Sequence, residues 1–244
     1  MKSLSLLPIL LFLLCLAPVN GAEVQPLRKQ LFNQDWKFFP GDAANASEAG
    51  FDDKSWRTLD LPHDWSIEGP IKADHPTGND GGYFQAGVGW YRKSFEVPAS
   101  WKEHKRVAIY FEGVYMNSEL FINGKSLGVY PYGYSSFRYD LTPYLEYGKP
   151  NQIAVRVDNS QQPNCRWYSG SGIYRHVWLE VTPPVHIAPW GVAVATTTAD
   201  SKSAVVSLKT IVMNSSPGMQ EVTVRSFIRD KSETVVGSME SVIR

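Results

Sequence analysis

Short segments in which apolar and polar residues alternate recur along this chain, and turn-forming residues separate them. RVAIYFEGV (residues 106–114) and NQIAVRVDN (residues 151–159) carry an apolar residue at every second position, which is the period of a strand with one buried face. In ELFINGKSLGVY (residues 119–130), two apolar runs flank Asn123-Gly124, a pair that tolerates the positive φ angles of a tight hairpin. Strands at this spacing predict an all-β fold, either a β-sandwich or a jelly roll.

A domain boundary is expected near the end of this pattern. GIYRHVWLEV (residues 172–181) predicts one more strand, and Pro183-Pro184, which follows it, cannot continue a central strand. We therefore expect a jelly-roll domain over residues 22–182. About four further strands are predicted beyond it, roughly half of the seven in an immunoglobulin-like sandwich. Residues 183–244 are accordingly expected to form a partial immunoglobulin-like domain.

One departure from β structure is expected near the start of the first domain. The segment NASEAGFDD (residues 45–53) favours a short helical turn, because the Ser47 hydroxyl can accept a hydrogen bond from a free backbone N–H at the start of a helix.

The first residues show a pattern typical of export. Lys2 precedes an apolar run over residues 4–16, and small residues follow it. The run is shorter than the roughly 20 residues that span a bilayer. Residues 1–21 are therefore predicted to be a signal peptide, with the protein exported to the periplasm or the extracellular space and without a membrane span. Cys15 would leave with the signal, so Cys165 has no partner for an internal disulfide.

Charge and motif content argue against several function classes. The chain has 24 Lys and Arg against 24 Asp and Glu and no basic block, which argues against nucleic acid as a partner. Its five histidines lack metal-ligand spacing, so no metal site is predicted. The glycines of residues 75–95 do not follow the pattern of a strand, a Gly-x-Gly-x-x-Gly turn and a helix that binds phosphate, so no cofactor is predicted.

The loop DLPHDWSIEGP (residues 60–70) offers two carboxylates, Asp64 and Glu68. Glycoside hydrolysis uses two carboxylates that face one bond, but nothing in a loop bounded by proline and glycine enforces such a separation here. A single role for Asp64, accepting hydrogen bonds from sugar hydroxyls, is favoured over a catalytic pair. His63 is interpreted as a loop residue that orders the turn, since no nucleophile motif accompanies it.

The segment NCRWYSGSG (residues 164–172) combines groups suited to holding a polyol. Arg166 supplies fixed N–H donors, the Asn164 amide both donates and accepts, and Trp167 and Tyr168 offer apolar faces with polar tips. The alternative is a structural turn in which the arginine pairs with a carboxylate.

The aromatic residues of the glycine-rich loop allow similar alternatives. Tyr83 and Phe84 either stack on a sugar or anchor their loop. Trp90 and Tyr91, at the entry to a strand, are predicted to lie in the core.

Six motifs in order carry a family resemblance. They are FNQDWKF, FDDKSWRTLDLPHDWSIEG, GVGWYRKSFEVP, VYMNSELFINGKSLGVYPYGYSSFRYDLTPYL, NQIAVRVDN and RWYSGSGIYRHVWLEV. From about residue 31 to 181 the chain resembles the N-terminal part of glycoside hydrolase family 2 enzymes. Within the family, it is most like the exported bacterial β-galactosidases. The resemblance implies a jelly-roll, galactose-binding-like sugar-binding domain, then an immunoglobulin-like domain, then a (β/α)₈ barrel with two catalytic glutamates and a retaining mechanism.

The resemblance also implies roles for individual residues. In the family, loops of the first domain reach the barrel mouth and contact the terminal sugar, which assigns substrate binding to Asp64, Arg166 and Asn164. Trp65 and Trp167 are expected to be packing residues. No catalytic residue is assigned, because the barrel that carries the glutamates has no counterpart in this sequence, and the chain is expected to be inactive alone. Its expected partners are a terminal galactoside-like sugar and the catalytic barrel of a full-length enzyme; the alternatives are a free-standing carbohydrate-binding module and an assembly subunit.

Overall fold

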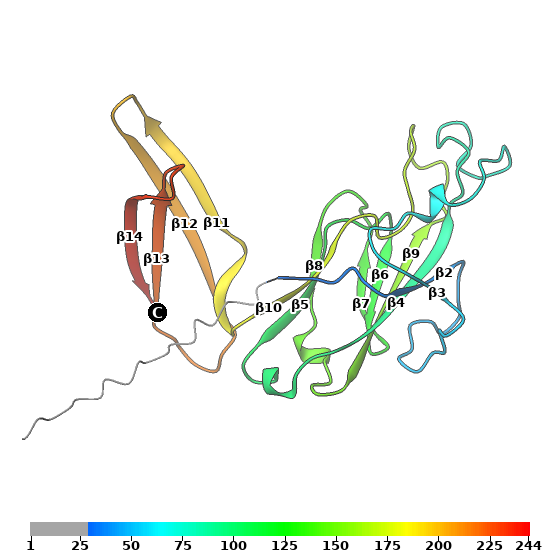
Figure 1. The fold of residues 1–244 in the computed structure, drawn as a ribbon, viewed down its shortest axis with the longest axis horizontal. Helices are drawn as coiled ribbons and strands as arrows, with labels where there is room; N and C mark the ends of the chain where they lie inside the picture. Colours follow the sequence, from blue (N-terminus) through cyan, green and yellow to red (C-terminus); the bar gives the residue numbers. More distant parts are fainter. Residues whose placement is uncertain (1–28) are drawn as a thin grey trace, which may run out of the picture.

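The structure, a computed structural model, describes residues 29–244 of the chain. The predicted signal peptide over residues 1–21 lies outside the described residues. In the described part, the regular structure consists of β-strands and three single-turn 3₁₀ helices (Figure 1), which confirms the expected all-β fold. The 3₁₀ helices are η1 (Trp65–Ile67), η2 (Ala99–Trp101) and η3 (Thr142–Tyr144).

Two antiparallel sheets form the sandwich of the first domain. The six-stranded sheet has the order β3 (Arg57–Leu59), β2 (Trp36–Pro40), β4 (Gly87–Glu96), β9 (Pro150–Asn159), β6 (Ser118–Ile122) and β7 (Lys125–Tyr130). The four-stranded sheet has the order β1 (Gln30–Leu31), β10 (Val177–Thr182), β5 (Arg106–Phe111) and β8 (Phe137–Asp140). Several neighbours, such as β1 with β10 and β4 with β9, come from distant parts of the chain, so closing the sandwich brings together loops that are far apart in sequence.

The core lies between the two sheets and follows the alternation in the sequence. Val107, Ile109 and Phe111 of β5 are fully buried, because successive side chains of a strand point to opposite faces. Tyr91 of β4 is also buried in this core, whereas its neighbour Trp90 is buried on the opposite face of the six-stranded sheet. Both aromatic residues are therefore buried as predicted.

The outer face of the six-stranded sheet carries a second apolar cluster, which the loop between β2 and β3 covers. Its buried members are Ala46, Trp56, Trp90 and Ala154. The predicted helical turn at residues 45–53 is wrong: residues 44–50 form irregular turns. Asn45 in this segment has a φ of +64°, which a right-handed helix does not allow, and the carbonyl groups of residues 46 and 48 accept hydrogen bonds from the buried guanidinium of Arg92.

Two local strand predictions had different outcomes. The hairpin at Asn123-Gly124 is confirmed, since β6 and β7 flank it and both residues have positive φ, +50° and +83°. The strand expected over residues 172–181 begins only at Val177. Before that point the backbone pairs with loops instead, since the Ile173 carbonyl accepts a hydrogen bond from the His63 N–H at 2.9 Å.

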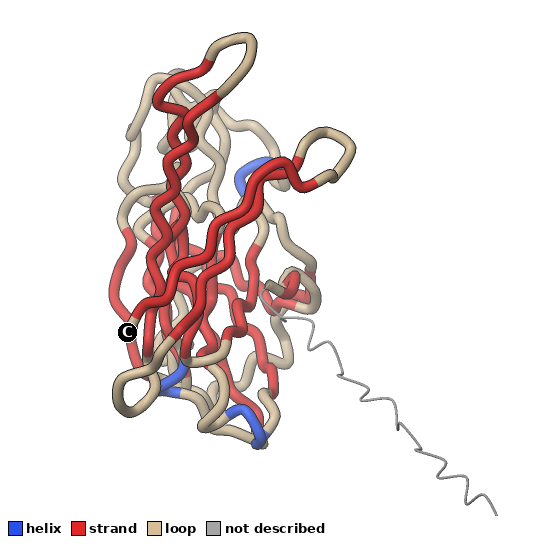
Figure 2. Tube along the Cα trace, turned by 90° about the vertical axis from the view of Figure 1, so that its left-hand side faces the viewer, coloured by secondary structure: helices blue, strands red, loops and turns tan. Residues whose placement is uncertain are grey.

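Four strands follow the proline pair, as predicted. β11 (Val185–Ala199) pairs with β12 (Ala204–Asn214), and β13 (Val222–Arg229) pairs with β14 (Val235–Ile243). Figure 1 shows the two long hairpins beside the sandwich, and Figure 2, turned by 90°, shows them in front of it. The Arg106 guanidinium, which donates to the Ser215 carbonyl at 2.6 Å, ties the base of the hairpins to the first domain.

Candidate functional site

Long loops from three parts of the chain converge at one end of the sandwich, the end opposite the hairpins in Figure 1. They are residues 60–70, residues 71–86 and residues 160–172. Direct contacts join all three: the Tyr168 hydroxyl donates to Asp64, and the Phe84 ring lies edge-on to the Tyr168 ring at 4.8 Å. The Asp64 and Arg166 loops therefore share one end of the scaffold.

The Asp64 carboxylate is the main connection between two of these loops. Its Oδ1 accepts hydrogen bonds from the backbone N–H groups of Ser66 at 3.0 Å and Ser171 at 2.8 Å, and its Oδ2 accepts from the Tyr168 hydroxyl. The bond from Ser66 also caps the start of η1. Gly170 lies against this carboxylate so closely that an added Cβ would collide with it. Sequence reasoning missed the capping role of Asp64 and its hydrogen bond with Tyr168.

The two other predicted binding residues differ in how free their polar groups are. The Asn164 amide is half-buried and already used: Nδ2 donates to Asn159 Oδ1 at 2.6 Å, and Oδ1 accepts from Ser169 Oγ at 3.2 Å. Arg166 is exposed, and within residues 29–244 its guanidinium makes no hydrogen bond or ion pair. The alternative of a structural arginine paired with a carboxylate therefore has no support among the described residues.

A buried polar network sits beneath these loops. Ser66 Oγ donates to Ser171 Oγ at 2.8 Å, and Asn159 Nδ2 donates to the same hydroxyl at 2.7 Å. All three residues are buried, so each bond replaces one that water would otherwise make. Sequence reasoning missed this network; the only local signal is the serine held between Gly170 and Gly172.

His63 belongs to a second network below the 60–70 loop. Its Nδ1 lies 2.6 Å from the Tyr91 hydroxyl, and its Nε2 lies 2.9 Å from the Arg57 guanidinium and 3.1 Å from Glu68 Oε1. The interpretation of His63 as a residue that orders its turn is confirmed. Glu68 pairs with Arg57 at 2.7 Å, whereas Asp64 is held by Ser66, Ser171 and Tyr168, so the two carboxylates belong to different networks.

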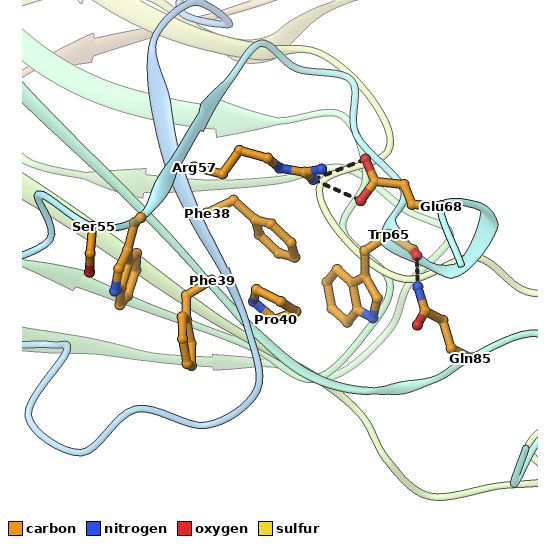
Figure 3. A pocket seen from close by; sticks show the side chains of 9 residues that line it. Phe38, Phe39, Pro40, Ser55, Arg57, Trp65, Glu68 and Gln85 are labelled. Atoms are coloured by element: carbon orange, nitrogen blue, oxygen red, sulfur yellow. Dashed lines mark hydrogen bonds and ion pairs between the residues drawn. The ribbon is translucent and has the colours of Figure 1, made fainter. Parts of the chain in front are cut away.

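A cleft of about 390 Å³ lies beside the 60–70 loop (Figure 3). Figure 3 shows the Arg57 guanidinium directed at Glu68, while the Phe38 and Trp65 rings line the wall. The Gln85 side-chain amide donates to the Trp65 carbonyl at another wall. None of Asp64, Asn164 and Arg166 lines this cleft. The Phe38 and Trp65 rings that line the cleft are almost fully buried by packing. The cleft therefore lies next to the predicted binding loops, and their polar residues do not form it.

Comparison with known proteins identifies the family. Residues 32–183 match the model described as "Glycosyl hydrolases family 2, sugar binding domain". The chain belongs to glycoside hydrolase family 2. Among its relatives, the β-galactosidase BoGH2A of Bacteroides ovatus is 52% identical over 222 residues, which cover 91% of this chain and 26% of the relative. A β-glucuronidase of Formosa agariphila is 32% identical, over 84% of this chain and 23% of the relative.

A solved family 2 structure supports the same assignment. A β-glycosidase from Bacteroides vulgatus superposes with a TM-score of 0.84 at 42% identity, over 88% of this chain and 28% of that chain. The present chain thus spans about a quarter of the length of the curated relatives it matches, and it corresponds to their N-terminal, non-catalytic sugar-binding portion.

The two tryptophans that the resemblance assigned to packing behave differently in this family 2 chain. Trp65 is buried against Phe38 and Tyr91, as expected. The expectation for Trp167 is wrong, because its side chain is 64% exposed. Its loop is held by Asp64, Asn159 and their partners, which leaves the indole free to face solvent at the loop tip.

The described residues contain neither a cluster of metal-binding side chains nor a helix able to span a membrane. Residues 29–244 contain no group of three or more His, Cys, Asp or Glu arranged to hold a metal ion. Likewise, no helix in this range has the length and apolar character needed to cross a bilayer.

The buried setting of His63 predicts a pH-dependent stability. Burial lowers the pKa of His63 below 6.5, because the charged ring is poorly solvated there. As the pH falls below the unfolded value, the unfolded chain binds the proton first, so His63 contributes stability above about pH 6.5 that is lost on acidification. We expect the free energy of unfolding to fall between about pH 7.5 and about pH 5.5, with a slope from this residue of at most about 1.4 kcal/mol per unit.

Urea denaturation at the two pH values measures this effect. His63→Gln should flatten the dependence, whereas His104→Gln, at an exposed position, should leave it as it is. An equal fall in the wild type and in His63→Gln would contradict the assignment.

Proposed function

We propose that this chain is the sugar-recognition portion of an exported, retaining β-galactosidase-like enzyme, and that its converging loops bind the terminal sugar. The observation that supports this most is the direct connection of the Asp64 loop to the Arg166 loop, at one end of the scaffold. The signal peptide predicted over residues 1–21 supports a periplasmic or extracellular location.

The three proposed binding residues would act in different ways. Arg166 has unpaired N–H donors, which can bind sugar hydroxyls without breaking an existing bond. Asp64 Oδ1 accepts two hydrogen bonds and Oδ2 accepts one, from the Tyr168 hydroxyl, so Oδ2 keeps a lone pair that can accept a sugar hydroxyl. Asn164 orients its loop through Asn159 and Ser169, and it contacts sugar only if one of those bonds is exchanged.

This arrangement divides the work between two parts of a complete enzyme. A retaining glycosidase uses two carboxyl groups about 5–5.5 Å apart, one as acid/base and one as nucleophile. The proposed role of the present loops is to fix the orientation of the terminal sugar against those groups. Contacts away from the reacting bond increase the rate when they position the substrate, so their loss affects turnover as well as binding.

Hydrolysis of p-nitrophenyl β-D-galactopyranoside by the full-length enzyme tests the proposal. Arg166→Ala is expected to lower kcat/KM by about tenfold or more, the loss of roughly one charge-assisted hydrogen bond. Arg229→Ala, at an exposed position of β13, is the matched control and should leave kcat/KM unchanged. Unchanged kinetics in Arg166→Ala would overturn the assignment of this loop.

A free-standing carbohydrate-binding module is the second candidate. The exposed faces of Trp167 and Tyr168 beside Arg166 favour it, because aromatic faces and fixed donors are the usual components of sugar sites. Titration of the isolated chain with lactose separates the two candidates. Micromolar affinity that is lost in Arg166→Ala supports the module, whereas millimolar or weaker binding supports an incomplete site that needs the rest of an enzyme.

A further inference from the structure

A second cleft lies at the other end of the first domain, between the outer face of the four-stranded sheet and the start of β11. Its volume is about 260 Å³. The residues that line it come from β8, β10, β11 and the position before β1, and they include Lys29, Arg138, Glu180, Thr182 and Trp190. None of them belongs to the Asp64 or Arg166 loops, and Figure 1 shows the hairpin on the opposite side of the sandwich from those loops.

An irregularity in β11 creates one wall of this cleft. The register of β11 with β12 shifts between Ile187 and Val192, so the residues between them leave the ladder. Gly191 packs so closely on the Ala188 carbonyl, at 2.7 Å from an added Cβ, that a larger residue does not fit. The bulge places Trp190, with a φ of +51°, at the edge of the cleft. Its indole is 72% exposed and lies 6.0 Å from the Tyr110 ring.

The floor of the cleft is polar and ordered. Arg138 Nε donates to Glu180 Oε2 at 2.8 Å, and both side chains are about four-fifths buried. The Lys29 ammonium lies 4.5 Å from the centre of the Tyr110 ring and 4.4 Å from that of Trp178, which holds it over the sheet.

Thr182 contributes a buried hydroxyl oxygen without a hydrogen-bond partner among the described residues. Because this oxygen is buried from solvent, it belongs to the wall of the cleft and is not a contact for a ligand.

We propose that this cleft is a second saccharide-binding site, separate from the loops that recognise the terminal sugar. One pyranose ring stacks its C–H face on the Trp190 indole, and its hydroxyls bond to the Arg138–Glu180 pair and the Lys29 ammonium. An exposed aromatic plane beside a fixed donor–acceptor pair suits a ring with one apolar face and equatorial hydroxyls. The cleft has room for one such ring and is open at its edge, so the ring would be one unit of a longer chain.

The proposed site would hold a polysaccharide to the protein independently of hydrolysis. A site that is ordered before the ligand arrives loses less conformational entropy on binding. The hydrogen bond from Arg106 to the Ser215 carbonyl, which holds the base of the hairpin against the first domain, contributes to this order. A site on the first domain at a distance from the terminal-sugar loops raises the local concentration of chain ends near an active centre without taking part in the reaction.

The indole N–H signal of Trp190 in a ¹H–¹⁵N spectrum of this chain tests the proposal. The signal is assigned by its absence in Trp190→Ala, a change at an exposed position. Titration with β-1,4-galactotetraose and, separately, with cellotetraose should shift this signal in a saturable manner for at least one probe. Trp190→Ala should weaken the affinity of that probe about tenfold, and Glu180→Gln should also weaken it.

Two matched variants give the test its specificity. Trp167→Ala removes another exposed indole, and Asp64→Asn combined with Arg166→Ala disables the terminal-sugar loops; the Trp190 signal should respond to the probe as before in both. This keeps failure of the second site distinct from failure of the proposed function. The proposal is overturned if neither probe shifts the Trp190 signal at about 10 mM, a concentration that detects even weak binding, or if Trp190→Ala binds as the wild type does.

Discussion

Arg92→Ala is expected to lower the free energy of unfolding by about 3 kcal/mol, because it removes the partner of several buried polar groups at once. The Arg92 side chain is 1% exposed. Its Nε donates to Asp53 Oδ2 at 2.8 Å, its NH1 group donates to the carbonyls of Ala46 and Glu48, and the guanidinium lies over the Phe51 ring. Without it, the loop that covers the outer face of the six-stranded sheet loses its main attachment.

Urea denaturation followed by tryptophan fluorescence measures this loss. Arg225→Ala is the control, since Arg225 also pairs with a carboxylate at 2.7 Å but both side chains are more than half exposed. An exposed pair of this kind contributes at most about 1 kcal/mol. If the two variants lost similar stability, the guanidinium would not be the anchor of the loop that the contacts indicate.

Gly172→Ala is expected to cost about 3 kcal/mol or more and to loosen the two predicted binding loops together. Gly172 has a φ of +130°, a conformation that side chains disfavour, and it lies where the loops cross. An added Cβ would collide with the Tyr91 hydroxyl and would lie 2.6 Å from the His63 carbonyl and 3.2 Å from the Trp65 ring. Tyr91 and Trp65 are buried in the core and cannot move aside cheaply.

Gly87→Ala separates the two causes of this effect. Gly87 has nearly the same φ, +129°, but an added Cβ there has nothing within 4 Å. Gly87→Ala should therefore lower the free energy of unfolding by the backbone strain alone, about 1–2 kcal/mol. Denaturation curves give the stabilities, and limited proteolysis between residues 160 and 172 reports the loosening of the loop. Equal losses in the two variants would show that the close packing of Gly172 is not what matters.

The strands and the hairpin could be predicted because their signals are local. A strand with one buried face needs an apolar residue at every second position, and a tight hairpin needs residues that accept positive φ, as at Asn123-Gly124. The helical turn expected at residues 45–53 failed for the complementary reason. Its local preference was weak, and contacts with a guanidinium more than 40 residues away in sequence hold the segment as irregular turns.

The candidate site could be predicted only in part. The residue types at Asp64, Arg166 and Asn164 indicated polar recognition, and their assignment to sugar binding stays a prediction. What Asp64 contacts could not be read from its neighbours, because its hydrogen-bond donors at Tyr168 and Ser171 are more than 100 residues distant. The exposure of Trp167 was mispredicted for the same reason, since whether an indole is covered depends on which loops close around it.

The sequence by itself determined the all-β class, the strands that form the core and the family, since these depend on periodicity and on motifs that stand in a fixed order along the chain. Only the tertiary structure decided which polar groups are free and which are engaged: Arg166 is open, whereas Asp64 is held by Tyr168. It also decided that Trp190 and the Arg138–Glu180 pair line one cleft. The physical reason is that hydrogen bonding and burial depend on distances in space, which closure of the two sheets sets between residues far apart in sequence.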